Sequence, residues 1–78
     1  MKIIDELLPG CFLLSPPTVD DLRGLFRKTY SAQTFSNLGL SINWVEDFYT
    51  VSAKNVIRGM HFVAPPYEHD KLVYCLNG

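Results

Sequence analysis

The chain has 78 residues, of which 47% are hydrophobic and 19% are charged, which is the composition of one small globular domain and not of a disordered segment. Seven Lys and Arg residues stand against eight Asp and Glu residues, and a net charge of −1 lacks the basic excess of nucleic-acid and membrane-surface binders. No apolar run approaches the length of a transmembrane helix, and acidic residues follow Ile4 too soon for a signal peptide. With only Cys11 and Cys75, we expect reduced thiols that pack in the interior of a cytoplasmic protein.

The first half of the chain predicts two strands and one short helix. Gly10–Leu14 is an apolar strand that the following prolines end, and Asp20–Gly24 has the acids and glycine of a turn. Leu25–Tyr30 follows as a second strand. Ser31–Leu38 predicts a helix with Ser31 at its N-cap, Phe35 and Leu38 on one face, and Gly39 as its stop.

The second half predicts three more strands. These are Ile42–Ser52, Val56–Val63 and Lys71–Leu76, separated by a tight connection at Ala53–Asn55 and by prolines at 65 and 66. The last strand runs into Asn77-Gly78, a strong hairpin signal that calls for a returning strand. Ten aromatic residues are scattered along the chain, so either its surface is unusually apolar or it packs on a partner subunit or on further sequence. We therefore expect residues 1–78 to belong to a single all-β domain, of which they form the N-terminal part.

Three polar side chains in this apolar region are candidates for chemistry. Buried charges are costly unless they are paired or functional, so Arg58 and His61 stand out within their strand. Histidine suits a general base, while Arg58 and Lys71 suit the stabilisation of an enolate. Strand alternation places Arg58 and His61 on opposite faces, unless a bulge at Gly59 brings them together. The alternative is a core histidine and a surface arginine.

Arg23 has two possible roles. Its guanidinium fork suits an anion clamp for phosphate, but the residues alone favour an ion pair within the turn, with Asp20 or Asp21. Asp47 lies among apolar residues and is a candidate for a buried hydrogen-bonding group. A metal site is not expected, because His61 and His69 lie eight positions apart with no His-x-His pair.

In this order, these pieces resemble the dTDP-4-dehydrorhamnose 3,5-epimerase family of cupin-fold sugar-nucleotide epimerases. The most specific part is the Arg-Gly-x-His element followed at this interval by Lys-Leu-Val. The segments that carry the resemblance are Pro9-Gly10, Asp21–Phe26, Val45–Asp47, Val56–Phe62, Pro65-Pro66 and Lys71–Val73.

The resemblance implies a jelly-roll β-barrel with one short helix and a homodimer that exchanges N-terminal strands. It implies that His61 removes a proton beside the ketone of a nucleotide-linked 4-keto-6-deoxy sugar, at C3 or C5, with Lys71 and Arg58 beside the developing enolate. It also implies that Arg23 and Phe26 contact the nucleotide diphosphate, and that no metal or redox cofactor is needed. The family's tyrosine acid and base-orienting aspartate are expected beyond residue 78.

The chain departs from the family's pattern at two places that help to hold the nucleotide. Lys28 stands where the family usually has Glu, and Glu46-Asp47-Phe48 stands where it has Gln-Asp-Asn. The resemblance thus leaves open a different sugar nucleotide, or epimerisation of a single carbon. The leading hypothesis is an epimerase in deoxysugar and polysaccharide biosynthesis. The alternatives are a non-catalytic cupin-like module that binds a sugar nucleotide or dimerises, and a metal-dependent cupin.

Overall fold

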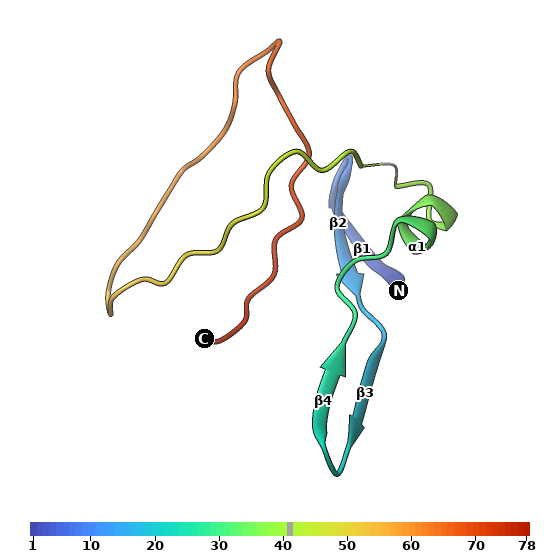
Figure 1. Ribbon diagram of the computed structural model, residues 1–78. Helices are drawn as coiled ribbons and strands as arrows, with labels where there is room; N and C mark the ends of the chain where they lie inside the picture. The colour runs from blue at the N-terminus through green and yellow to red at the C-terminus, as the bar shows by residue number, and fades with distance from the viewer. Residues whose placement is uncertain (41) are drawn as a thin grey trace. The chain divides into compact units, whose positions relative to one another are not determined.

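The computed structural model describes residues 1–40 and 42–78, and its contacts divide the chain into two units, Met1–Asn43 and Trp44–Gly78. All the helix and strand of the described residues lies in the first unit (Figure 1). The predominance of strands with one short helix is as expected, and the described strands form two separate two-stranded sheets. In chain order the elements are β1 (Lys2–Leu8), β2 (Cys11–Ser15), β3 (Thr18–Asp21), β4 (Gly24–Arg27) and α1 (Ala32–Asn37).

The β1–β2 hairpin is antiparallel and turns at Pro9 and Gly10. Leu8 pairs with Cys11 across the two-residue turn, and Gly10 has φ of 79°. Proline at the first central position and a positive φ at the second define a type II turn. The register shifts at Ile4 and at Leu7, so β1 is bulged twice. The sequence prediction found β2 but missed β1, although Pro-Gly between two apolar runs was the signal for it.

The β3–β4 hairpin brings the predicted turn residues together. Asp21 pairs with Gly24, which leaves Leu22 and Arg23 as the two residues of the turn. The turn was predicted correctly, whereas the short strand β3 before it was not. The second strand of this hairpin ends at Arg27, so the predicted strand over Leu25–Tyr30 is too long.

The helix α1 has the predicted position and the predicted stop. Ser31 is its N-cap residue, but the Ser31 hydroxyl makes no capping hydrogen bond. At the other end, Gly39 N–H donates to Ser36 C=O (3.0 Å) and Leu40 N–H donates to Phe35 C=O (2.9 Å). These two bonds, with Gly39 at φ of 75°, form a Schellman motif. The helix therefore ends at a backbone conformation that glycine adopts without steric cost.

A substitution at Gly39 tests this helix stop. We expect Gly39→Ala to lower the free energy of unfolding by about 1–2 kcal/mol, because an L-residue with a Cβ is strained in the left-handed region. No atom lies within 4 Å of an added Cβ, so the loss reports the backbone and not a clash. Gly39→Asn is the matched control, since asparagine tolerates this conformation. Equal urea denaturation midpoints for the Ala and Asn variants would contradict this explanation.

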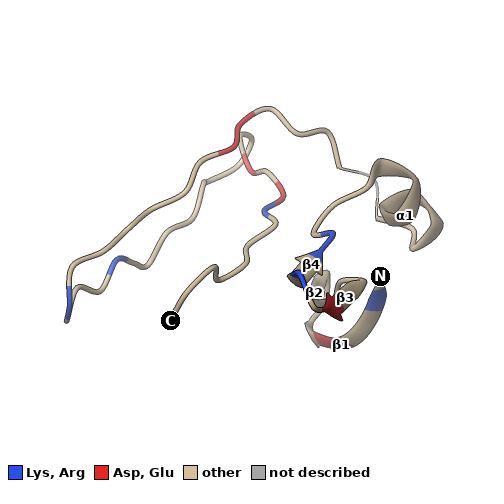
Figure 2. Cartoon of the chain, turned by 60° about the horizontal axis from the view of Figure 1, so that its bottom comes forward, with Lys and Arg blue, Asp and Glu red and all other residues tan. Residues whose placement is uncertain are grey.

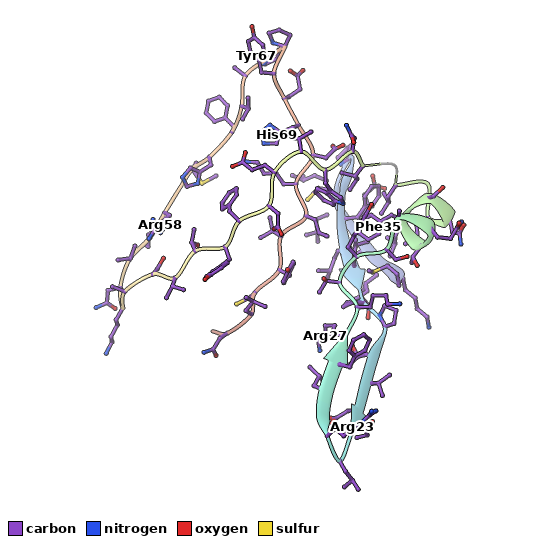
Figure 3. The ribbon with its side chains drawn as sticks, viewed as in Figure 1. Arg23, Arg27, Phe35, Arg58, Tyr67 and His69 are labelled. Atoms are coloured by element: carbon purple, nitrogen blue, oxygen red, sulfur yellow. The ribbon has the colours of Figure 1, made fainter. Side chains whose placement is uncertain are left out.

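Phe35 is the one buried hydrophobic side chain among the described residues, with 1% of its surface exposed. The Tyr30 ring meets it edge to face, at a centroid separation of 4.9 Å and an interplanar angle of 61°. Figure 3 shows Phe35 on the side of α1 that faces the β1–β2 hairpin. Leu38, predicted to share the apolar face, is half-buried. The core of the first unit is therefore centred on the helix.

The second unit contains turns but no assigned strand among its described residues. Val56 N–H donates to Ala53 C=O (3.2 Å), and Asn55 has φ of 69°, so the tight connection at Ala53–Asn55 is confirmed. A second turn is closed by the bond from Tyr67 N–H to Ala64 C=O (3.1 Å). The predicted strands over 42–52, 56–63 and 71–76 are not formed, because a strand requires the paired backbone hydrogen bonds of a neighbouring strand, and no such strand pairing is assigned to the described residues of these segments.

Large apolar side chains are exposed in both units. In the first unit they include Ile4, Leu7 and Leu8 of β1, and in the second Ile57, Met60 and Phe62. An isolated two-stranded hairpin is marginally stable in water and needs a further layer on its apolar face. The described residues do not contain that layer.

Candidate functional site

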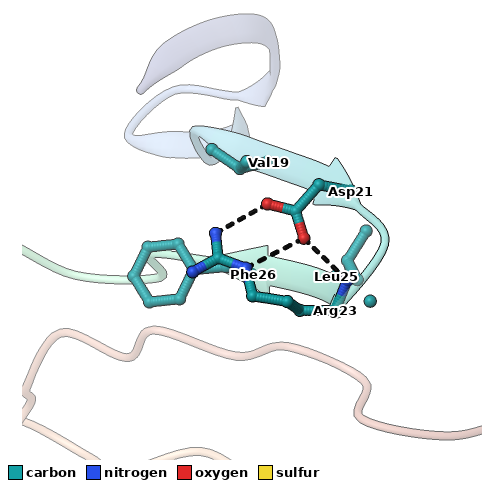
Figure 4. Close-up of a pocket in the computed structure, with 6 residues that line it drawn as sticks. Val19, Asp21, Arg23, Leu25 and Phe26 are labelled. Carbon is teal, nitrogen blue, oxygen red and sulfur yellow. Dashed lines mark hydrogen bonds and ion pairs between the residues drawn. The ribbon is translucent and has the colours of Figure 1, made fainter.

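The β3–β4 turn holds the best-defined polar arrangement in the described chain. Asp21 Oδ1 accepts hydrogen bonds from the backbone N–H (2.9 Å) and the Nε (3.1 Å) of Arg23, and Asp21 Oδ2 accepts one from Arg23 Nη2 (2.6 Å) (Figure 4). Short acids commonly bond the backbone two residues ahead in this way. The predicted ion pair of the turn is thus formed, and its partner is Asp21 and not Asp20.

The ion pair shifts the pKa of both partners. The side-chain hydrogen bonds from Arg23, followed by its backbone N–H, lower the pKa of Asp21 below the ordinary value of 3.8. The same side-chain bonds raise the pKa of Arg23 further above its already high value. At physiological pH the turn therefore carries a fixed guanidinium–carboxylate pair.

This shift has a definite dependence on pH. Because the folded-state pKa of Asp21 is lowered, the contribution of the pair is fully present above pH 3.8 and is lost as the pH falls through the lowered pKa. We expect an NMR titration of the Asp21 carboxyl carbon to give a midpoint below 3.8 in the native protein. In Arg23→Gln the midpoint should move upward. An unchanged midpoint in that variant would contradict the pairing.

Arg23 and Phe26, both predicted to contact a nucleotide diphosphate, line one hollow on the β3–β4 hairpin. Its other lining residues are Val19, Asp21, Gly24 and Leu25. The Arg23 side chain is 88% exposed and Phe26 is 61% exposed, so the guanidinium and the ring are both open to a ligand. Lys28 directly follows β4, and its backbone N–H donates to Pro17 C=O (3.2 Å). The structure therefore brings three of the predicted ligand-binding residues onto one hairpin.

The predicted catalytic residues lie in the second unit and are all exposed. Arg58 Nε donates to Ser52 Oγ (2.9 Å) across the Ala53–Val56 turn, a contact that the sequence prediction missed. His61 and Lys71 form no hydrogen bond or ion pair with described residues. No contact joins Arg58, His61 and Lys71, because their position relative to one another depends on strand pairing that is absent here.

Other residues singled out by the sequence prediction are also exposed to solvent. Glu46, Asp47 and Phe48 are exposed, so the prediction of Asp47 as a buried hydrogen-bonding group is wrong here. Cys11 and Cys75 are free thiols, and both are exposed and not packed as predicted. The physical reason is the same for each residue, since no second layer covers these segments.

Residues 1–40 and 42–78 contain neither a metal-binding cluster nor a membrane-spanning helix. No three His, Cys, Asp or Glu side chains lie close enough together to hold a metal ion. None of the described helix is long and apolar enough to cross a membrane. Figure 2 shows basic and acidic residues interspersed along the described chain, without a segment of one sign.

The β3–β4 hairpin presents a guanidinium and an aromatic ring at one hollow. A site of this class suits a ligand in which an anionic group is joined to a planar ring. A family model described as dTDP-4-dehydrorhamnose 3,5-epimerase matches residues 5–78. The chain therefore belongs to the dTDP-4-dehydrorhamnose 3,5-epimerase family, as the resemblance indicated.

Relatives in several organisms agree with this assignment. The chain is 38% identical over 79 residues to the dTDP-4-dehydrorhamnose 3,5-epimerase of Salmonella typhimurium and 35% identical over 79 residues to that of Escherichia coli. Each alignment covers 100% of this chain and 43% of the relative, so the chain spans less than half the length of these proteins. It is also 31% identical over 72 residues to a dTDP-4-dehydrorhamnose 3-epimerase of Streptomyces niveus, covering 91% of this chain and 35% of the relative. No solved structure gives a significant match.

Proposed function

We propose that residues 1–78 are the N-terminal part of an epimerase that acts on a nucleotide-linked 4-keto-6-deoxy sugar. The observation that carries this proposal is the family match over residues 5–78, which includes every candidate site residue from Arg23 to Lys71. The hollow of the β3–β4 hairpin supports it, because it offers a cation and an aromatic ring to a nucleotide diphosphate.

His61 is proposed as the base. A ketone at C4 acidifies the hydrogens at C3 and C5, so an imidazole beside either carbon can remove that proton. Lys71 and Arg58 then stabilise the negative charge on the enolate oxygen. A proton returned to the opposite face of the same carbon completes the inversion, and the sugar is neither oxidised nor reduced. The reaction needs one base, one acid and one or two cations.

Nucleotide binding is proposed for the residues to which the resemblance assigns that role. Arg23 binds the diphosphate through its free N–H groups, and Phe26 packs against the nucleotide. Lys28, and the segment Glu46–Phe48, occupy positions that the resemblance assigns to nucleotide binding. Lys28 supplies a positive charge where the family usually has an acid, so it adds attraction for the diphosphate. The choice of nucleotide is expected to depend on Lys28 and Phe48.

We propose that the complete fold is a jelly-roll barrel formed by a homodimer with exchanged N-terminal strands. This proposal is supported by strand-forming segments that form no strand and by apolar side chains that are exposed. Segments 42–52, 56–63 and 71–76 have strand-forming sequences but no assigned strand among the described residues, and β1 exposes Ile4, Leu7 and Leu8. Strands from the remainder of the domain would pair with the segments, and a second copy would cover β1. A single domain over residues 1–78 and beyond then replaces the two units.

The proposed reaction belongs to deoxysugar synthesis for surface polysaccharides, in the cytoplasm. Its support is the names of the relatives, which specify a dTDP-linked dehydrorhamnose.

Solvent exchange tests the proposed activity. The full-length protein is incubated in deuterium oxide with dTDP-4-keto-6-deoxyglucose, and the sugar protons are followed by NMR. An epimerase incorporates deuterium at C3, at C5 or at both carbons, whereas a non-catalytic module binds the nucleotide without any incorporation. Binding without deuterium at either carbon would overturn the enzymatic proposal.

A further inference from the structure

We propose that Asp21 is a positioning residue that holds the Arg23 guanidinium ready for the phosphate oxygens of the ligand. This inference rests on the proposed role of Arg23 in nucleotide binding. Asp21 is expected to strengthen ligand binding, whereas its negative charge alone would weaken the binding of an anion.

The geometry of the turn carries the first step. Asp21 accepts from Arg23 Nε and Nη2 on one edge of the guanidinium, and from the Arg23 backbone N–H as well. A guanidinium has five N–H donors in a rigid fork, and Asp21 uses two of them. Both donors on Nη1 and the second donor on Nη2 remain, and one N–H of each nitrogen forms the end edge of the guanidinium, which also fits two oxygens of a phosphate. Asp21 therefore fixes the orientation of the fork and leaves a second bidentate edge open.

The register of the hairpin shows why Asp21 has this role and Asp20 does not. Asp21 pairs with Gly24 and Val19 pairs with Phe26, so Asp21, Val19 and Phe26 share one face of the two-stranded sheet. Asp20 pairs with Leu25 on the opposite face and forms no hydrogen bond to Arg23 among the bonds of the described turn. Asp20 is therefore a control that removes an equal charge from the neighbouring position without removing a bond to Arg23.

The ion pair matters for position more than for stability. The Arg23 side chain is 88% exposed, and exposed ion pairs contribute little to folding. A long exposed side chain loses rotamer freedom when it binds a ligand, and that loss weakens binding. Because Asp21 already restricts Arg23 in the free protein, less rotamer freedom is lost when the ligand binds, and binding is stronger.

Replacing Asp21 by Asn separates position from charge, because the two effects have opposite signs. Removal of a negative charge beside the phosphate site should tighten binding of the anion on electrostatic grounds alone. Loss of the second acceptor oxygen frees the Arg23 fork and should weaken binding. We expect Asp21→Asn to raise the Kd for dTDP by about three- to tenfold.

The experiment measures the Kd of dTDP by isothermal titration calorimetry for the full-length protein and four variants. The variants are Asp21→Asn, Arg23→Gln, the double variant and Asp20→Asn, each checked for an unchanged thermal midpoint. The proposal predicts weaker binding in both single variants at the turn, and no further loss when Asp21→Asn is added to Arg23→Gln. Asp20→Asn should bind dTDP like the native protein.

The outcomes distinguish this inference from the proposed function. If Arg23→Gln weakens dTDP binding while Asp21→Asn leaves it equal or tighter, positioning by Asp21 is wrong and the role of Arg23 stands. If Asp21→Asn weakens binding equally with and without Arg23, its effect is not exerted through the guanidinium, and the inference also fails. If Arg23→Gln has no effect, the role of Arg23 fails and nothing remains for Asp21 to position.

Discussion

Replacing His61 by Asn in the full-length protein is expected to lower the rate of deuterium incorporation, and with it turnover, by about 10²- to 10⁴-fold. Asparagine is close to histidine in size and still forms hydrogen bonds, but it cannot take up a proton near neutral pH. The Kd for dTDP should stay near the native value, because the proposed nucleotide contacts are made by Arg23 and Phe26. Proton NMR in deuterium oxide measures the rate, and calorimetry measures the affinity.

His69→Asn is the matched control for this prediction. His69 comes just after the turn closed by Ala64 and Tyr67, outside the predicted strands, and has no proposed role. It should exchange protons at the native rate. A His61→Asn variant that retains native exchange, or a His69→Asn variant that loses it, would show that the base has been assigned to the wrong residue.

Replacing Phe35 by Ala is expected to lower the free energy of unfolding by about 3–5 kcal/mol. The Phe35 side chain is 1% exposed, so its removal both exposes apolar surface and leaves a cavity beside Tyr30. The ring pair with Tyr30 is lost as well, which contributes about 0.5–1.5 kcal/mol within that total. Urea denaturation monitored by circular dichroism measures the change.

Leu22→Ala is the control for Phe35→Ala. Leu22 lies at the tip of the β3–β4 turn and is fully exposed, so its truncation should change stability by less than about 0.5 kcal/mol. If Phe35→Ala were as mild as Leu22→Ala, the helix would not be the centre of the core.

The local features of this chain were predictable from sequence because short-range chemistry determines them. The helix stop at Gly39 needs only a residue that adopts positive φ, and the break after Ser15 needs only the two prolines. The turn at Asn55 follows from the tolerance of asparagine for the same conformation. In each case the residues that determine the structure are neighbours in the chain.

The strands of the second half were not predictable in the same way. Ile42–Ser52 and Val56–Val63 have strand-forming composition, but a strand exists only when another segment supplies hydrogen bonds. Sequence pattern identifies the segments that are able to pair and not the partners that they find. Conversely, β1 was missed because its acidic residues obscured the apolar run, although β2 lies only a two-residue turn away.

In the candidate site, too, local contacts were predictable from sequence and contacts between distant segments were not. The contact of Arg23 with Asp21 spans two residues within one turn, so the sequence was sufficient to predict it as one of two alternatives. The grouping of Arg58 and His61 with Lys71 requires two segments, 56–63 and 71–76, to come together in a barrel, and that depends on strand pairing beyond the local sequence. The family match supports the proposed function, which local chemistry alone left open.

The central claim is that His61 reaches the carbon next to the ketone, with the cations of Arg58 and Lys71 beside the enolate oxygen. The most direct test is a crystal structure of the full-length protein with a bound dTDP-sugar. We expect an imidazole nitrogen of His61 within about 3–3.5 Å of C3 or C5, and the Lys71 ammonium on the oxygen side of C4. A His61 ring that lies in an apolar interior, with Lys71 in solvent far from the sugar, would contradict it.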